Sequence, residues 1–190
     1  MSLAYLLASL PYLVFDTPAP LNAEAFLTAC REQLSECDAE AAAALVSGGI
    51  GLRPVTPANR PEACPTFVRE WVDFEKQLRD SVAQWRIARR KVAGASRSHG
   101  ATWERDVPAT LAWEQDVPAT LDPLARDTAL DRLRWNKAGE MEGLVPMTLD
   151  ALFAYAVKLR ISLRRSAMTR EAGLAKLDEM AATPLPGGDG

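Results

Sequence analysis

The sequence has few of the side chains that enzymes most often use for chemistry. Its 190 residues include one histidine, His99, and three cysteines, Cys30, Cys37 and Cys64, with no Cys-x-x-Cys pair. A structural zinc site needs four Cys or His ligands at a recognisable spacing, and these four residues show no such spacing. We therefore expect reduced cysteines, no metal and no cofactor.

Motifs for catalysis and for nucleotide binding are absent as well. Gly48-Gly49-Ile50-Gly51 is not a phosphate loop, because no strand precedes it and no Lys-Ser/Thr follows it. The sequence contains neither a serine-nucleophile motif nor an obvious pair of carboxylates in an apolar setting. We expect a protein that is not an enzyme and that has no small-molecule substrate.

Long hydrophobic runs are also missing. The apolar segment Leu3–Leu10 is short, and no Lys or Arg precedes it, unlike the charged start of a signal peptide. No segment reaches the length of about 20 apolar residues that a membrane-spanning helix needs. The sequence therefore predicts a cytoplasmic chain.

The amino-acid composition is typical of a folded protein. The hydrophobic fraction of 48% and the charged fraction of 25% separate the chain from disordered proteins, and its net charge of -3 disfavours a dedicated nucleic-acid binder. The length allows one domain with a core. We expect a single helical domain over residues 1–182, with a loop at 48–65 and a linker at 94–121, followed by a disordered tail at 183–190.

The longest helical pattern covers residues 67–92. One stripe of apolar side chains recurs in steps of three and four, as on one face of a helix: Phe67, Trp71, Phe74, Leu78, Val82, Trp85, Ala88 and Val92. Gly94 marks the expected end, and Glu75 and Arg79 have the spacing of an i,i+4 ion pair. The pattern predicts an all-α helical bundle organised on this one long central helix.

Shorter helices are expected on both sides of it. Residues 3–15 are apolar throughout, and either a buried strand or a short buried helix fits so short a run. Further helices are expected to begin at the capping residues Asn22, Asp38, Asp122, Thr148 and Thr169. The helix that follows Thr148 is the most apolar of these and should be largely buried.

A tandem decapeptide lies in the linker. The sequence ATWERDVPATL at 101–111 is followed by LAWEQDVPATL at 111–121, which aligns Trp103 with Trp113. A local duplication that lengthens a loop explains it, since loops tolerate insertion. The alternative is a partner interface anchored by the two tryptophans, because aromatic side chains dominate such contacts.

Basic residues gather in two clusters, late in the 67–92 pattern and near the C-terminus. Cations decorate helix C-termini for electrostatic reasons, which accounts for both clusters. The functional interpretation is an electropositive face for an acidic protein surface, with nucleic acid disfavoured because no aromatic residues alternate with the charges. The candidate partner interface consists of Arg86, Arg89, Arg90, Lys91, Trp103, Trp113, Arg160, Arg164 and Arg165.

Several short motifs resemble one known family. They are Tyr5-Leu6-Leu7-Ala8-Ser9-Leu10-Pro11, Phe74-Glu75 with Leu78-Arg79-Asp80, Leu130-Asp131 with Arg134-Trp135, and Tyr155 with Lys158-Leu159. This set resembles an uncharacterised bacterial family, domain of unknown function 2764, whose genes usually lie beside those of vacuolar/archaeal-type rotary ATPases. Asp80 departs from the family, where Asn is expected after Leu-Arg, and the doubled decapeptide is private to this chain.

The resemblance implies a non-catalytic accessory or structural subunit of such an ATPase. It implies a fold like that of the helical, funnel-shaped subunit that couples the central stalk to the membrane rotor ring, both of which would be partners. Membrane association would then be peripheral, at the inner face, and only through those partners. The alternative is a free-standing helical adaptor that binds an acidic protein or nucleic acid through its basic helix ends.

Overall fold

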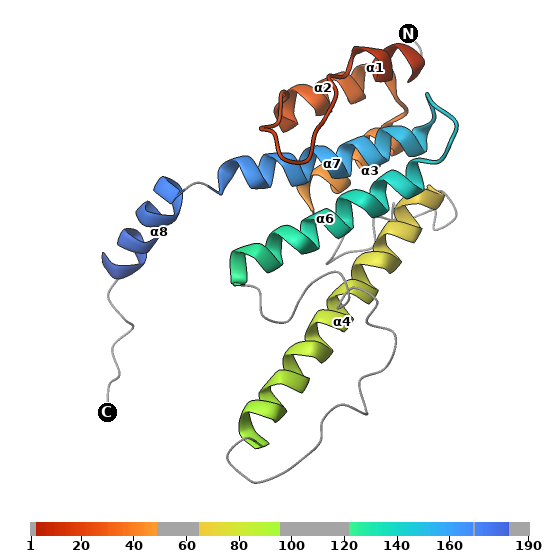
Figure 1. Cartoon of the computed structure of the whole chain (residues 1–190). Helices are drawn as coiled ribbons and strands as arrows, with labels where there is room; N and C mark the ends of the chain where they lie inside the picture. The colour runs from red at the N-terminus through yellow and green to blue at the C-terminus, as the bar shows by residue number, and fades with distance from the viewer. Residues whose placement is uncertain (1–2, 49–64, 96–121, 169, 183–190) are drawn as a thin grey trace, which may run out of the picture.

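The computed structural model describes residues 3–48, 65–95, 122–168 and 170–182. These residues form seven helices and no strand, so the predicted all-α class is confirmed (Figure 1). The helices are α1 (Leu3–Ser9), α2 (Ala23–Gln33), α3 (Glu36–Ser47), α4 (Thr66–Ala95), α6 (Pro123–Glu142), α7 (Leu149–Ala167) and α8 (Arg170–Ala182).

The helix at the centre of the described residues is α7. It packs against α2, α3, α4 and α6, and Leu152, Phe153 and Leu159 are completely buried. Figure 1 shows α7 with α1 and α2 on one side and α6 and α4 on the other. The expectation that the bundle is organised on residues 67–92 is therefore wrong, because the helix buried on the most sides, rather than the longest one, occupies the centre.

Helix α4 is nevertheless the long helix that the periodicity predicts. Its 30 residues end at Ala95, one residue beyond the predicted stop at Gly94. Phe67 and Trp71 lie in the main core, whereas Leu78 and Trp85 form a smaller cluster with side chains of α6. The C-terminal end of α4 extends beyond the other labelled helices in Figure 1.

Most of the expected capping residues begin helices. The side chains of Asn22, Asp122 and Thr148 each accept a hydrogen bond from a backbone N–H in the first turn that follows. Asp38 does not cap its helix, because Ser35 takes that position and accepts from the Asp38 N–H. Thr169 lies outside the described residues.

The N-terminal segment is half helix and half extended chain. Residues 3–9 form α1, and no strand follows it, which decides between the two alternatives for residues 3–15. Leu6, Leu13 and Phe15 are buried, and the Tyr155 hydroxyl donates a hydrogen bond to the Pro11 carbonyl oxygen at 3.0 Å. The segment is thereby fixed to the centre of the fold.

Helix α8 has a different character. Leu174 and Leu177 expose more than half of their surface, and in Figure 1 this helix stands apart from the rest. No helix in the described part of the chain is both long enough and apolar enough to cross a membrane.

Candidate functional site

Three helices enclose a cleft of about 330 Å³. Five arginines line it, and they come from α4 (Arg79 and Arg86), from α6 (Arg134) and from α7 (Arg160 and Arg164). Asp127 and Asp131 of α6 also line it, and its apolar wall is formed by Trp71, Leu78, Val82, Leu130, Val157 and Ile161. We call this site the arginine cleft.

An ion pair joins two sides of the arginine cleft. Arg134 donates from Nε to Oε1 of Glu75 at 2.8 Å and from Nη2 to Oε2 at 3.4 Å. Glu75 is buried, and Asp131 lies 3.6 Å from the other guanidinium nitrogen of Arg134. A forked guanidinium–carboxylate pair is strongly directional, so this contact fixes α4 in register against α6.

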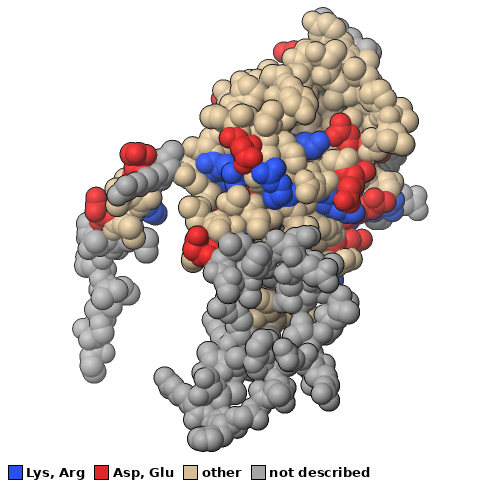
Figure 2. Space-filling view, viewed as in Figure 1, with Lys and Arg blue, Asp and Glu red and all other residues tan. Residues whose placement is uncertain are grey.

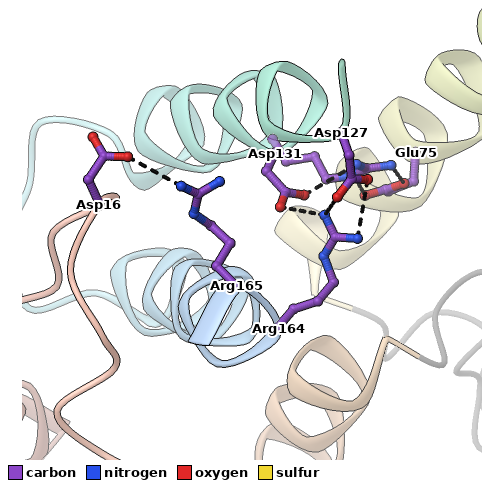
Figure 3. Close-up of polar contacts among 7 residues, drawn as sticks. Asp16, Glu75, Asp127, Asp131, Arg164 and Arg165 are labelled. Carbon is purple, nitrogen blue, oxygen red and sulfur yellow. Dashed lines mark hydrogen bonds and ion pairs between the residues drawn. The ribbon is translucent and has the colours of Figure 1, made fainter. Parts of the chain in front are cut away.

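A second ion pair joins α7 to α6. Arg164 donates to both carboxylate oxygens of Asp127, at 2.9 and 3.3 Å, and also contacts Asp131, which is 2% exposed (Figure 3). Burial alone would lower the pKa of Arg164, but the hydrogen bonds to Asp131 and Asp127 outweigh burial and raise the pKa. Arg164 is therefore held by carboxylates of this chain.

Arg160 is in a different situation. Its guanidinium makes no hydrogen bond or ion pair with any residue that the structure describes. Burial lowers its pKa, and the positive charges of Arg134 and Arg164 act in the same direction, while Glu75 and Asp131 oppose them. The cleft thus holds a guanidinium that has lost part of its hydration without gaining a carboxylate partner in return.

The position of Arg160 depends on a glycine at the end of α3. Gly48 has φ +74°, and a Cβ atom added there would lie 2.7 Å from the Arg160 Cζ. The positive φ favours glycine, because a side chain would strain the backbone, and a side chain there would also displace the flexible guanidinium of Arg160. The end of α3 also offers Arg160 the partial negative charge of a helix C-terminus.

Arg86 is the other arginine of the cleft without a partner among the described residues. It is exposed on α4. Counting Glu75, which pairs with Arg134, three carboxylates face five arginines and leave an excess of two positive charges. Figure 2 shows basic and acidic side chains gathered in one band across the face in view. The arrangement suits a ligand with negative charge.

A second group of charged residues is structural. Arg132 and Arg165 place their Cζ atoms 3.8 and 4.3 Å from the centroid of the buried Phe15 ring, and Trp135 meets the same ring edge-on. Asp16 accepts hydrogen bonds from both arginines, at 2.9 and 3.3 Å. These contacts attach the N-terminal segment to α6 and α7, and they place Arg165 outside the cleft.

The structure brings together part of the candidate interface predicted from the sequence. Arg86, Arg160 and Arg164 come from the two separate basic clusters and line one cleft. The side chains of Arg89, Arg90 and Lys91, on α4, lie outside the described part of the structure, as do Trp103 and Trp113 altogether.

Sequence reasoning missed Arg134 and its partner. The expected pairing of Glu75 with Arg79 is replaced by the pairing of Glu75 with Arg134, and the Arg79 Nε donates instead to the Glu75 carbonyl oxygen. One feature of the sequence could have pointed to Arg134. The spacing of Leu130, Asp131 and Arg134 places two charged side chains on the same face of α6 as an apolar one. That pattern indicates that a charged residue of α6 forms a buried ion pair, but it does not identify the residue on another helix that completes the pair.

Metal ligands do not gather in the described residues, where no group of three or more His, Cys, Asp or Glu side chains could hold one ion. Comparison with known proteins adds no family assignment, since no family model, curated protein or solved structure matches the chain. The chemistry of the cleft must therefore carry the functional argument.

Proposed function

We propose that the chain is a non-catalytic helical accessory protein that docks on a partner protein through the arginine cleft. The observation that carries the proposal is the pair Arg86 and Arg160, which lie in a cleft of excess positive charge without a carboxylate partner among the described residues. A negatively charged surface of another protein would supply that partner.

The composition of the cleft supports a binding role over a catalytic one. Its titratable side chains are arginines and the aspartates Asp127 and Asp131, and both aspartates are engaged by Arg164. Arginine stays protonated near neutral pH and does not serve as a general base there.

We further propose that the partner is a vacuolar/archaeal-type rotary ATPase, in which the chain stabilises or couples the central stalk and the membrane rotor ring. Support comes from the short motifs that resemble the family found beside such ATPases. Residues of separate motifs meet in the fold: Tyr155 bonds to Pro11, and Glu75 pairs with Arg134. The departing residue Asp80 is exposed, where a partner could contact it.

The proposed mechanism is mechanical. The ion pairs of Arg134 and Arg164 connect α4 and α7 to α6, so the three helices that bear the cleft would move as one body under load. A rigid bundle of this kind fixes the relative position of the subunits docked on it. Association with the membrane would be indirect, at the inner face, through the ATPase subunits.

Copurification tests this function. A tagged chain expressed in its native cells should recover rotary ATPase subunits from gently solubilised membranes, identified by mass spectrometry. The matched control is the tagged double variant Arg86→Gln/Arg160→Gln, which should recover far less. Recovery of no ATPase subunit by the wild-type chain, even after mild crosslinking, would contradict the proposal.

The second candidate is a free-standing adaptor for an acidic protein, which the charge of the cleft favours equally. This candidate predicts that the wild-type chain copurifies with an acidic protein unrelated to the ATPase. The double variant Arg86→Gln/Arg160→Gln should no longer recover that protein. Nucleic acid is the less favoured partner, because no aromatic residues alternate with the charges in the two basic clusters of the sequence.

A further inference from the structure

We propose that the arginine cleft receives two carboxylates from one acidic segment of the partner, one at Arg160 and one at Arg86. This inference rests on the proposed docking function. It adds the chemical class of the ligand and the residues that bind it. Arg134 and Arg164 act as positioning residues, since carboxylates of this chain already hold them.

The two arginines reach the cleft from different helices. Arg160 comes from α7, and its guanidinium lies beside Gly48 at the end of α3, whereas Arg86 is exposed on α4. Each lacks a carboxylate partner among the described residues, so two acidic side chains of one peptide segment would supply one partner to each.

The charges that surround Arg160 favour a carboxylate over a phosphate. Asp131 and Glu75 stand close enough to affect its titration, and their field opposes a doubly charged phosphate more than a singly charged carboxylate. The guanidinium groups of Arg134 and Arg164 in this cleft also contact carboxylates. The incoming group would extend the same pattern.

The apolar wall adds a requirement on the partner segment. Leu78, Val82 and Leu130 lie along the cleft between α4 and α6. A segment that crosses it places apolar side chains against this wall and carboxylates at the two arginines. We therefore expect an amphipathic acidic peptide rather than a uniformly charged one.

The experiment uses the full chain and a defined peptide probe. The probe is a fluorescein-labelled peptide of about 12 residues with two glutamate pairs separated by leucines. The control probe carries glutamine at every glutamate. Fluorescence anisotropy measures binding to the wild-type chain and to Arg160→Gln and Arg86→Gln, with Arg69→Gln on α4 and Arg165→Gln on α7 as controls outside the cleft.

The wild-type chain should bind the glutamate probe and not the glutamine probe, and loss of either cleft arginine should weaken binding by about tenfold. Arg69→Gln and Arg165→Gln should leave binding unchanged. Thermal melts check that each variant is folded, and Arg86→Gln provides the test even if Arg160→Gln does not fold, because Arg86 is exposed.

Several results would overturn the inference. They are no binding of the glutamate probe, equal weakening by the cleft and control variants, or displacement of the probe by inorganic phosphate at an ionic strength where chloride has no effect. If copurification with the ATPase succeeds while the probe does not bind, only this inference fails. If the probe binds at Arg160 and Arg86 but no ATPase subunit is recovered, only the proposed partner fails.

Discussion

Arg134 of α6 and Glu75 of α4, 59 residues apart in the sequence, form a forked ion pair at 2.8 and 3.4 Å. Both side chains are largely removed from water, with 21% and 10% of their surface exposed. The pair closes one side of the arginine cleft and sets the position of α4 relative to α6. Its removal should therefore affect stability more than the removal of a surface charge.

Glu75→Gln should lower the free energy of unfolding by about 3 kcal/mol, because it leaves the guanidinium of Arg134 without its charged partner in a largely buried place. Urea denaturation measures the change. Glu70→Gln, at an exposed position of the same helix, serves as the control and should stay within about 0.5 kcal/mol of the wild type. Equal effects of the two substitutions would show that the pair does not stabilise the fold.

Asp131 and Asp127 offer a comparison within one ion-pair cluster. Both accept from Arg164, but the Asp131 side chain is 2% exposed and that of Asp127 is 35% exposed. Asp131→Asn should therefore destabilise the fold by about 2 kcal/mol more than Asp127→Asn, since water replaces the lost contact only at the exposed position. Chemical denaturation of both variants gives the difference, and the reverse order would refute the assigned burial.

Gly48→Ala should separate two effects at the end of α3. The positive φ makes any side chain cost about 1 kcal/mol, and the added methyl group should displace the flexible guanidinium of Arg160. Gly143→Ala is the control, because Gly143 also has a positive φ, of 73°, but no atom lies within 4 Å of its added Cβ. Both variants should lose stability, and only Gly48→Ala should weaken the glutamate probe.

Stability should fall in alkaline solution. Burial raises the pKa of Cys30 from 9.0 to about 11 and that of Tyr155 from 10.0 to about 12, so the folded chain holds both protons more tightly than the unfolded chain. Their stabilising contributions are complete below pH 9 and are lost progressively as the pH rises to about 12. Unfolding curves between pH 8 and 11 test this decline.

Tyr155→Phe should make that alkaline decline shallower, because phenylalanine has no proton to lose. The substitution also removes the hydrogen bond to the Pro11 carbonyl oxygen, so a small loss of stability at neutral pH accompanies it. A decline identical to that of the wild type would show that Tyr155 does not contribute to it.

Local features of the fold were predictable because local interactions create them. Asn22, Asp122 and Thr148 cap helices with their own side chains, and the periodicity of residues 67–92 depends only on one helix face. The central place of α7 was not predictable in this way. Helix length is a property of one segment, whereas the number of neighbours around a helix is a property of the whole packed chain.

In the cleft, too, some features could be predicted from the sequence and others could not. Arg86, Arg160 and Arg164 could be selected as candidates because positive charge is visible in the sequence. Their meeting at one site, and the pairing of Arg164 with Asp131, depend on the packing of α4, α6 and α7. No spacing in the sequence relates residues on three different helices.

The most direct test of the account follows the arginine side chains themselves. In the ¹⁵N-labelled chain, the Nε–H signals of Arg160 and Arg86 can be assigned from the spectra of Arg160→Gln and Arg86→Gln. We predict that the glutamate probe shifts both signals and leaves that of Arg165, held by Asp16 outside the cleft, in place. Binding of the probe without a shift at Arg160 would contradict the assignment of the arginine cleft as the docking site.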